Sequence, residues 1–379
     1  MSQFLAPSFL QKSNIYEINI RQYSAEGTFN AFAEHLPRLR SMGIEILWLM
    51  PVHPIGRINR KGSLGSYYSI SDHKGINPEF GNEQDFKSLI QKAHNLGFKV
   101  ILDWVANHCS WDHVWTKSNP DFFLQKDGNF VSPFDWHDVI QLNHSNLAQQ
   151  EEMKNCMAYW IREFDIDGFR ADLAHLTPLL FWIDARKRFD KLKPGLIWLA
   201  ESEDINYCEA FDITFTWRWM HLTEEVIKEK GSVDVLRQFL ENENFPGLRL
   251  YFTSNHDENS WNGTEYDKYN GFAKALAVFS FLYPGSIPLI YSGQESANKK
   301  MLDFFDKDEI NWNGFLLDSF YKELFEIRKC IGSTELKFLN LDGLLAWETK
   351  EMKVLINLSF EIKNYGTNSI LPGEWLAIK

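Results

Sequence analysis

Two stretches near the start of the chain share one pattern of apolar and polar positions. Between residues 29 and 42, apolar side chains recur at every third or fourth position, which predicts a helix, and Gly43 follows directly. A nearly continuous apolar run, Ile44–Leu49, comes next. The same order returns between residues 86 and 102, where Gly97 separates a helical pattern from Phe98–Leu102. Short apolar runs after helices are typical of buried parallel strands, so the pattern predicts successive α/β units.

Six further segments have the apolar character of buried strands. They are Ile15–Ile20, Ile166–Arg170, Ile197–Glu201, Asp212–Phe215, Leu250–Thr253 and Ile287–Tyr291. Helical periodicity lies between them, over Leu147–Phe164, Pro178–Lys191, Trp219–Glu229, Val233–Glu241 and Gly271–Leu282. Strands that alternate with helices in this number predict an α/β protein with a closed (β/α)8 TIM barrel. A doubly wound open sheet is the alternative that strand counting leaves open.

The alternation is interrupted after the third strand. Residues 109–146 are rich in Trp, Asp, Asn and His, and long irregular insertions in compact domains are usually functional. After a helix at Leu316–Cys330, alternating apolar residues and turn residues predict a small antiparallel β segment. We therefore expect a barrel formed by residues 1–108 and 147–330, an inserted loop domain at 109–146, and a short C-terminal β domain at 331–379.

Composition and charge narrow the classes of partner. Hydrophobic residues make up 44% of the 379 residues, enough for a large core, while the net charge of −12 argues against nucleic acid or an anionic membrane. The four cysteines form no CxxC pair, which favours reduced thiols over a zinc site or a disulfide framework. Residues 1–12 lack the pattern of a signal peptide, and no apolar run is long enough to span a membrane. These features predict a cytoplasmic protein.

Polar residues appear where the predicted strands end. In a barrel, the carboxyl ends of the strands and the loops that follow them carry the functional side chains. Four of these ends hold candidates for chemistry: Asp103 to His108, Arg170 with Asp172, Glu201, and Asn255-His256-Asp257. Alternation along a strand puts Arg170 and Asp172 on the same face.

Two of these carboxyls have the contrasting environments that glycoside hydrolysis needs. Arg170 should keep Asp172 ionised with a low pKa, as a nucleophile requires. Glu201 emerges from an apolar run beside Trp198, and desolvation there should raise its pKa and keep it protonated. Asp257 is a third acid, and His108 and His256 are candidate hydrogen-bond partners for sugar hydroxyls.

Each residue also has a structural interpretation. An aspartate at a strand end is more often a helix cap than a catalyst, and Asp103 can tether a loop. The segment Asn255–Asp257 can form a turn, and Glu201 has further acids close by in the sequence. The functional interpretation is favoured because the candidates occur together, in order, at the ends of four different predicted strands.

In this order the four segments resemble the signature regions of the α-amylase family of glycoside hydrolases, family 13. The resemblance extends to Tyr16-Glu17-Ile18, Trp48 to Val52, Tyr68 to Gly81 and Gly285 to Glu295, and so covers about residues 14 to 295. It implies double displacement with Asp172 as nucleophile and Glu201 as general acid/base. The two carboxyls would then lie about 5 to 5.5 Å apart.

The resemblance also implies roles for the residues around these two. Asp257 would be the third catalytic acid, which grips sugar hydroxyls in the transition state, and Tyr68 would stack on the sugar. The implied substrate-binding set is Tyr68, Asp103, His108, Arg170, His175 and His256.

Some positions depart from the family pattern. His175-Leu176 stand where the family often has Lys-His, and Asp72-His73 stand where it often has Asp-Tyr. Asn107 matches a frequent calcium ligand, and Asn143 lies in another signature segment, but the insertion offers no obvious full set of oxygen ligands. We therefore expect no required cofactor and leave calcium open.

The resemblance implies an enzyme that hydrolyses α-1,4 bonds in maltodextrin-like oligo- or polysaccharides. A transglycosidase or an α-1,6-specific glucosidase on the same barrel is the alternative. A metal-dependent hydrolase that uses Asp103, His108, His256 and Asp257 as ligands would need a His-x-His pair, and Asn19-Ile20-Arg21 does not supply one. A non-catalytic carbohydrate-binding protein would have lost one of the three acids, which are all present. The oligomeric state stays open.

Overall fold

The computed structural model describes residues 4–243, 245–332 and 335–379. Residues 1–3 and 244 of the predicted barrel, and residues 333–334 of the predicted C-terminal β domain, therefore lie outside the described residues. Eight parallel strands form a closed barrel in the order β1-β12-β11-β10-β9-β8-β3-β2, which confirms the predicted TIM barrel and not the open sheet. The strands are β1 (Ile15–Ile18), β2 (Ile46–Leu49), β3 (Lys99–Trp104), β8 (Gly168–Ala171), β9 (Ile197–Ala200), β10 (Ile213–Phe215), β11 (Leu248–Tyr251) and β12 (Ser286–Tyr291).

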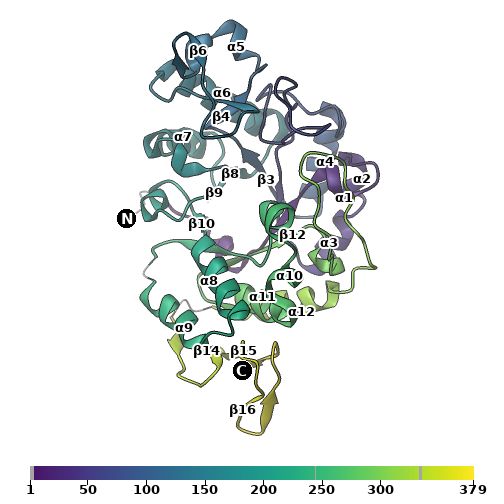
Figure 1. Ribbon diagram of the computed structural model, residues 1–379, viewed down its shortest axis with the longest axis vertical. Coiled ribbons are helices and arrows are strands. Elements are labelled where there is room, and N and C mark those ends of the chain that lie inside the picture. Colours follow the sequence, from purple (N-terminus) through teal and green to yellow (C-terminus); the bar gives the residue numbers. More distant parts are fainter. Residues whose placement is uncertain (1–3, 244, 333–334) are drawn as a thin grey trace.

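Helices surround the barrel (Figure 1). The predicted helix over residues 29–42 is two helices, α2 (Phe29–Ala33) and α3 (Leu36–Met42), because Pro37 in the first turn of α3 has no N–H for a continuous ladder. The others are α1 (Ile20–Tyr23), α4 (Glu83–Asn95), α6 (Leu147–Phe164), α7 (Leu179–Leu192), α8 (Trp217–Lys228), α9 (Val233–Asn242), α10 (Glu265–Tyr269), α11 (Ala273–Leu282) and α12 (Asp318–Lys329). In the described part of the chain, none is long and apolar enough to cross a membrane.

The interior of the barrel is a packed core of its own. Side chains from seven of the strands fill it, and Trp48, Ile101 and Phe215 are fully buried there. A larger core lies between the strands and the helices. Gly168 lets β8 approach β9 closely, because a Cβ atom at this position would lie 2.0 Å from the carbonyl oxygen of Ile197. These strands carry the candidate catalytic residues, so the close approach brings them together.

The insertion after β3 lies at one end of the molecule in Figure 1. It begins with β4 (His108–Ser110), which pairs with β7 (Val139–Gln141), and it contains α5 (Trp115–Ser118) and the two-residue strands β5 (Gln125–Lys126) and β6 (Asn129–Phe130). Its first strand thus starts one residue before the predicted segment 109–146.

Antiparallel strands form the C-terminal segment at the opposite end (Figure 1). Trp347 packs its ring 5.8 Å from that of Phe279 on α11 and 5.7 Å from that of Tyr283, so this segment rests on the barrel. The main sheet is β13 (Lys337–Phe338), β14 (Leu344–Glu348), β15 (Lys353–Asn357) and β18 (Trp375–Ile378), and β16 (Lys363–Tyr365) pairs with β17 (Asn368–Ile370).

Candidate active site

One buried arginine connects three carboxyl groups at the carboxyl ends of the strands. Arg170 on β8 places Nη1 2.8 Å from Asp103 Oδ1 and 2.9 Å from Asp172 Oδ1. Its Nη2 lies 2.7 Å from Glu201 Oε2, which also accepts the backbone N–H of Leu173 at 2.7 Å. A planar guanidinium presents its donors in a fixed fork, so this contact holds the carboxyls in a defined arrangement.

The expected low pKa of Asp172 is wrong for this structure. Burial raises the pKa of Asp172 well above its usual range, and the attraction of Arg170 only partly offsets it. One guanidinium shared among three carboxyls cannot compensate the desolvation of all of them. Burial likewise raises the pKa of Glu201, against the opposing effect of Arg170, in the direction expected for a general acid.

His256 has negative charges on two sides. Its Nδ1 lies 2.5 Å from Glu17 Oε1 on β1, and its Nε2 lies 3.4 Å from Asp257 Oδ2 and 2.7 Å from the Tyr68 hydroxyl. Burial alone would lower the pKa of His256, but Asp257 and Glu17 raise it overall, to about 9. His256 is therefore an imidazolium at neutral pH, and both of its ring nitrogens donate.

Asp103 lies behind the surface that a substrate would touch. Its side chain is fully buried, and its Oδ2 accepts hydrogen bonds from Trp48 Nε1 and from the Tyr68 hydroxyl, both at 3.1 Å. Together with its contact to Arg170, these bonds make Asp103 a support for residues of the site rather than a contact for a sugar.

The candidate residues surround a cavity of about 260 Å³ at the carboxyl end of the barrel. Of the predicted site residues, Tyr68, His108, Asp172, Glu201, His256 and Asp257 line it. Asp103 and Arg170 lie behind its lining, and His175 is exposed on the loop after Asp172 and does not line it. Nine further lining residues were not among the predicted site residues: Lys61, Ser66, Trp136, Asp138, Val139, Leu173, Trp261, Phe304 and Phe305.

Comparisons with known proteins agree with this geometry. A family model for the α-amylase catalytic domain matches residues 4–141. An α-amylase from Lactobacillus plantarum has a similar structure, with a TM-score of 0.88 and 27% identity over 98% of this chain and 99% of that one. A noncanonic maltogenic α-amylase from Thermotoga neapolitana gives a TM-score of 0.85 and 31% identity over 93% of this chain and 87% of that one.

This chain belongs to the α-amylase family of glycoside hydrolases. Transferases are also among its relatives. An α-1,4-glucan:maltose-1-phosphate maltosyltransferase from Picrophilus torridus is 26% identical over 384 residues, and the match spans 89% of this chain but 59% of that protein.

Of two positions that depart from the family pattern, His73 has a structural explanation. His73 is buried outside the cavity, where its Nε2 lies 2.9 Å from the carbonyl oxygen of Val105 and its ring stacks on Trp115 at 5.3 Å. It thus anchors the loop after β2 to the insertion. His175, in the place of the usual lysine, is exposed.

Asn107 and Asn143, the candidate calcium ligands, make hydrogen bonds within the protein. Gln141 Nε2 donates to Asn107 Oδ1 at 2.7 Å and to the Asn107 carbonyl oxygen at 3.0 Å, so a cation bound by these two oxygens would have to displace this amide. Asn143 Oδ1 accepts the N–H of Ser145 at 3.1 Å in a local turn. Within the described ranges, no cluster of His, Cys, Asp and Glu could hold a metal ion.

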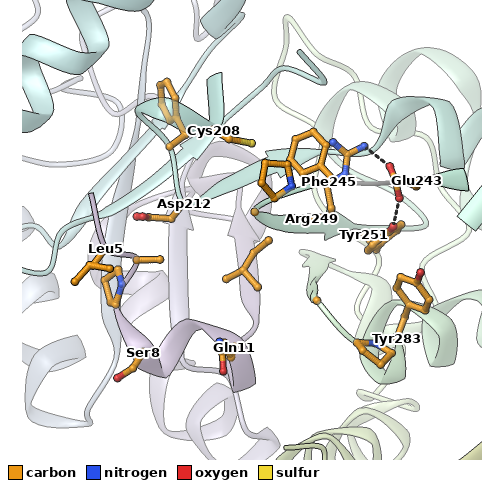
Figure 2. Close-up of a pocket in the computed structure, with 18 of the residues that line it drawn as sticks. Leu5, Ser8, Gln11, Cys208, Asp212, Glu243, Phe245, Arg249, Tyr251 and Tyr283 are labelled. Atoms are coloured by element: carbon orange, nitrogen blue, oxygen red, sulfur yellow. Dashed lines mark hydrogen bonds and ion pairs between the residues drawn. The ribbon is translucent and has the colours of Figure 1, made fainter. Parts of the chain in front are cut away.

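A second, larger cavity of about 580 Å³ lies at the other end of the barrel (Figure 2). Its charged groups have partners within the protein. Arg249 contacts Glu243 at 3.0 Å, and Glu243 also accepts a hydrogen bond from Tyr251 at 3.1 Å. Asp212 contacts Arg186, which does not line the cavity, at 2.6 Å. In TIM barrels, residues at this end contribute to stability, whereas catalytic residues lie at the opposite end.

Proposed function

We propose that this α-amylase family member is a retaining α-glycosidase that hydrolyses α-1,4 bonds of maltodextrin-like oligo- or polysaccharides. The observation that carries this proposal is the contact of Arg170 with both Asp172 and Glu201 at 2.9 and 2.7 Å. One guanidinium spans only a few ångström, which favours the carboxyl separation of retaining enzymes, about 5–5.5 Å, over the roughly 6.5–9.5 Å of inverting enzymes.

The residues have distinct roles in the proposed double displacement. Ionised Asp172 attacks the anomeric carbon, and the bond from this carbon to the leaving oxygen breaks while Glu201 gives that oxygen its proton. Water then gives a proton to Glu201 and attacks the anomeric carbon, and the bond to Asp172 breaks. The first product therefore has the α configuration of the substrate.

Double displacement needs a proton on Glu201 and an ionised Asp172. Burial raises the pKa of Glu201, the direction that a general acid needs, and Arg170 at 2.9 Å opposes the rise that burial causes in the pKa of Asp172. Asp257 and the His256 imidazolium lie at the same cavity and would bind sugar hydroxyls and stabilise charge in the transition state.

Transfer to a sugar acceptor is the second candidate function. The P. torridus relative is named a maltosyltransferase, and the same glycosyl–Asp172 intermediate would serve both reactions. Hydrolysis is favoured because water is the acceptor that needs no further binding site. An α-1,6-specific glucosidase is the remaining alternative, since the three acids do not select the linkage.

The test is incubation with maltooligosaccharides, isomaltose and pullulan, with products resolved by length and by anomer. We expect shorter maltooligosaccharides released as α anomers. Products longer than the substrate would support the transferase, and turnover of only isomaltose or pullulan would support the α-1,6 enzyme. β anomers as the first products, or no turnover of any substrate, would refute the retaining glycosidase.

A further inference from the structure

Residues from three loops meet at the lining of the catalytic cavity. Lys61 belongs to the loop between β2 and α4, which also carries Tyr68. Asp138 belongs to the insertion, and Phe305 to the loop after β12. All four residues line the cavity, so three separate segments contribute to its lining.

Backbone hydrogen bonds join two of these loops. The N–H groups of Leu64 and Gly65 donate to the carbonyl oxygen of Phe305 at 3.0 and 3.1 Å, and the N–H of Ser63 donates to Asp306 Oδ1 at 2.7 Å. A Cβ atom at Gly62 would lie 2.5 Å from Phe305 Cβ, so the two segments are in close contact. The segment that carries Lys61 is thereby held against the loop after β12.

Lys61 joins this pair of loops to the insertion. Its Nζ lies 2.8 Å from Asp138 Oδ1 and 5.8 Å from the ring centroid of Phe305. The side chain of Asp138 is 6% exposed, whereas that of Lys61 is 42% exposed. The ion pair therefore stands at the boundary between the cavity and solvent.

Within the proposed glycosidase function, on which this inference rests, we infer that the Lys61–Asp138 ion pair closes the cavity at the glycosyl side and binds the nonreducing end of the substrate. The enzyme would then remove short units from chain ends. Lys61 lies in the same loop as Tyr68, the expected stacking partner of the glycosyl unit, and both line the cavity, so the inference places the ion pair on that side. The leaving chain departs on the side of Glu201.

The chemistry of the pair suits a sugar terminus. An ammonium group has three donors and a carboxylate accepts several hydrogen bonds, so the pair keeps capacity for the 4- and 6-hydroxyls of a terminal sugar, of which an internal α-1,4-linked unit has only the 6-hydroxyl free. The cavity volume of about 260 Å³ is also below the ~300–1,000 Å³ typical of sites for drug-sized ligands. A cavity of this size suits a short part of a chain, such as its end.

The experiment compares two forms of maltoheptaose. One has a free nonreducing end, and the other carries an ethylidene group on the 4- and 6-hydroxyls of that end. We expect the wild-type enzyme to prefer the free form at least about tenfold in kcat/KM, since hydrogen bonds to charged groups contribute about 1.5–3 kcal/mol. In Lys61→Ala this ratio should fall toward one, because the blocked end can then extend out of the cavity.

Lys74→Ala is the matched control. Lys74 also makes an ion pair of 2.8 Å, with Glu152, its side chain is likewise 42% exposed, and it does not line the catalytic cavity. This variant should keep the wild-type ratio. Asp138→Asn preserves the size of the side chain and tests the same pair if Lys61→Ala does not fold, as judged by circular dichroism.

The outcomes separate this inference from the proposed function. Similar hydrolysis of both substrates by the wild type would refute chain-end recognition and leave the glycosidase assignment intact. A preference that persists in folded Lys61→Ala or Asp138→Asn would refute the role of the ion pair. Failure to hydrolyse either substrate would refute the proposed function itself, and chain-end recognition with it.

Discussion

At the scale of single residues, Arg170 is the group on which the site is organised. Its guanidinium is almost fully buried and contacts Asp103, Asp172 and Glu201. With all three acids ionised, one positive charge would face three negative ones in a desolvated space, which explains why burial raises their pKa values. Raised pKa values favour the protonated form, and this is the form in which a carboxyl can act as an acid.

Removing either carboxyl of the proposed pair should abolish most turnover. Asp172→Asn removes the nucleophile and Glu201→Gln the proton donor, and general acid–base catalysis alone contributes about 10²–10⁴-fold. We expect kcat on maltotetraose to fall by about 10³-fold or more in each variant. Both should fold, because each replacement relieves electrostatic repulsion while it keeps the shape of the side chain.

Glu203→Gln is the control for this experiment. Glu203 is two residues from Glu201, but its carboxylate pairs with Arg249 at 3.4 Å and accepts the N–H of Arg218, away from the catalytic cavity. Its turnover should stay within about twofold of the wild type, in line with an ordinary surface substitution. Activity close to wild type in Asp172→Asn or Glu201→Gln would contradict the assignment.

Glu17 should control the charge of His256. The negative charges of Asp257 and Glu17 raise the pKa of His256 to about 9 against the effect of burial, so Glu17→Gln should lower this pKa. An opposite charge at this distance shifts a pKa by about 1–3 units. The alkaline limb of kcat/KM should therefore move to lower pH by about one unit or more. A pH–rate profile with an unmoved alkaline limb would show that His256 does not need its charge.

At the scale of elements, the sequence predicts the barrel far better than the loops. All eight strands lie within two residues of the predicted ranges, because buried parallel strands are continuous apolar runs between helices. The helix over residues 29–42 was predicted as one piece, although Pro37 is a local signal for its division. The insertion has strands of only two or three residues, too short for any periodicity to develop.

The candidate site divides in the same way. Asp172, Glu201 and Asp257 follow predicted strands, so the topology alone brings them to one end of the barrel. Trp136, Trp261 and the other aromatic residues of the cavity come from loops, and the sequence does not distinguish them from the many buried aromatic residues. Glu17 gave one signal that could have been used, an acid inside an apolar strand.

The contact between Gln141 and Asn107 predicts that the insertion needs no calcium. Because the Gln141 amide bonds both oxygens of Asn107, we expect EDTA to leave the thermal midpoint of the wild type unchanged. Gln141→Glu would bring a carboxylate against these two oxygens without a donor between them. We expect this variant to melt about 1–4 °C lower in EDTA, and calcium to restore part of the loss, since buried unsatisfied acceptors cost about 1–3 kcal/mol.

Asn143→Ala is the comparison for this prediction. The Asn143 side chain makes a local turn with Ser145, so its loss should cost little stability and create no response to calcium. A wild-type enzyme that melts earlier in EDTA would contradict metal independence directly. Insensitivity of Gln141→Glu to calcium would contradict only the expectation that a cation can take the place of this amide.

At the scale of the whole molecule, buried histidines couple the fold to pH. His53, His73 and His113 lie together between the loop after β2 and the insertion, and His73 Nδ1 is 2.9 Å from His113 Nε2. Burial lowers the pKa of His53 to about 3 and that of His73 to about 4, and it lowers the pKa of His113 well below its usual value. The raised pKa values of the active-site carboxyls make the stability change with pH in the opposite direction. The informative measurement is therefore the difference in unfolding free energy between the wild type and a histidine variant.

The sign of the histidine effect follows from proton binding. Between about pH 6.5 and pH 4, unfolded chains bind a proton at His73 and the folded protein does not, so stability that is full above pH 6.5 is lost as the pH falls. The loss is about 1.4 kcal/mol per pH unit for each such histidine. His73→Phe keeps an aromatic ring against Trp115 and removes this titration.

We therefore expect His73→Phe to be less stable than the wild type at pH 7, because it loses the hydrogen bonds of the imidazole, but to lose less stability on acidification. Between pH 7 and pH 5 the difference in urea unfolding free energy between the two proteins should narrow by about 2 kcal/mol. His221→Phe, at an exposed histidine, should follow the wild type over the same range. Parallel curves for wild type and His73→Phe would mean that the buried imidazole takes up its proton in the folded state, and the loop after β2 would then have to open to admit the charge.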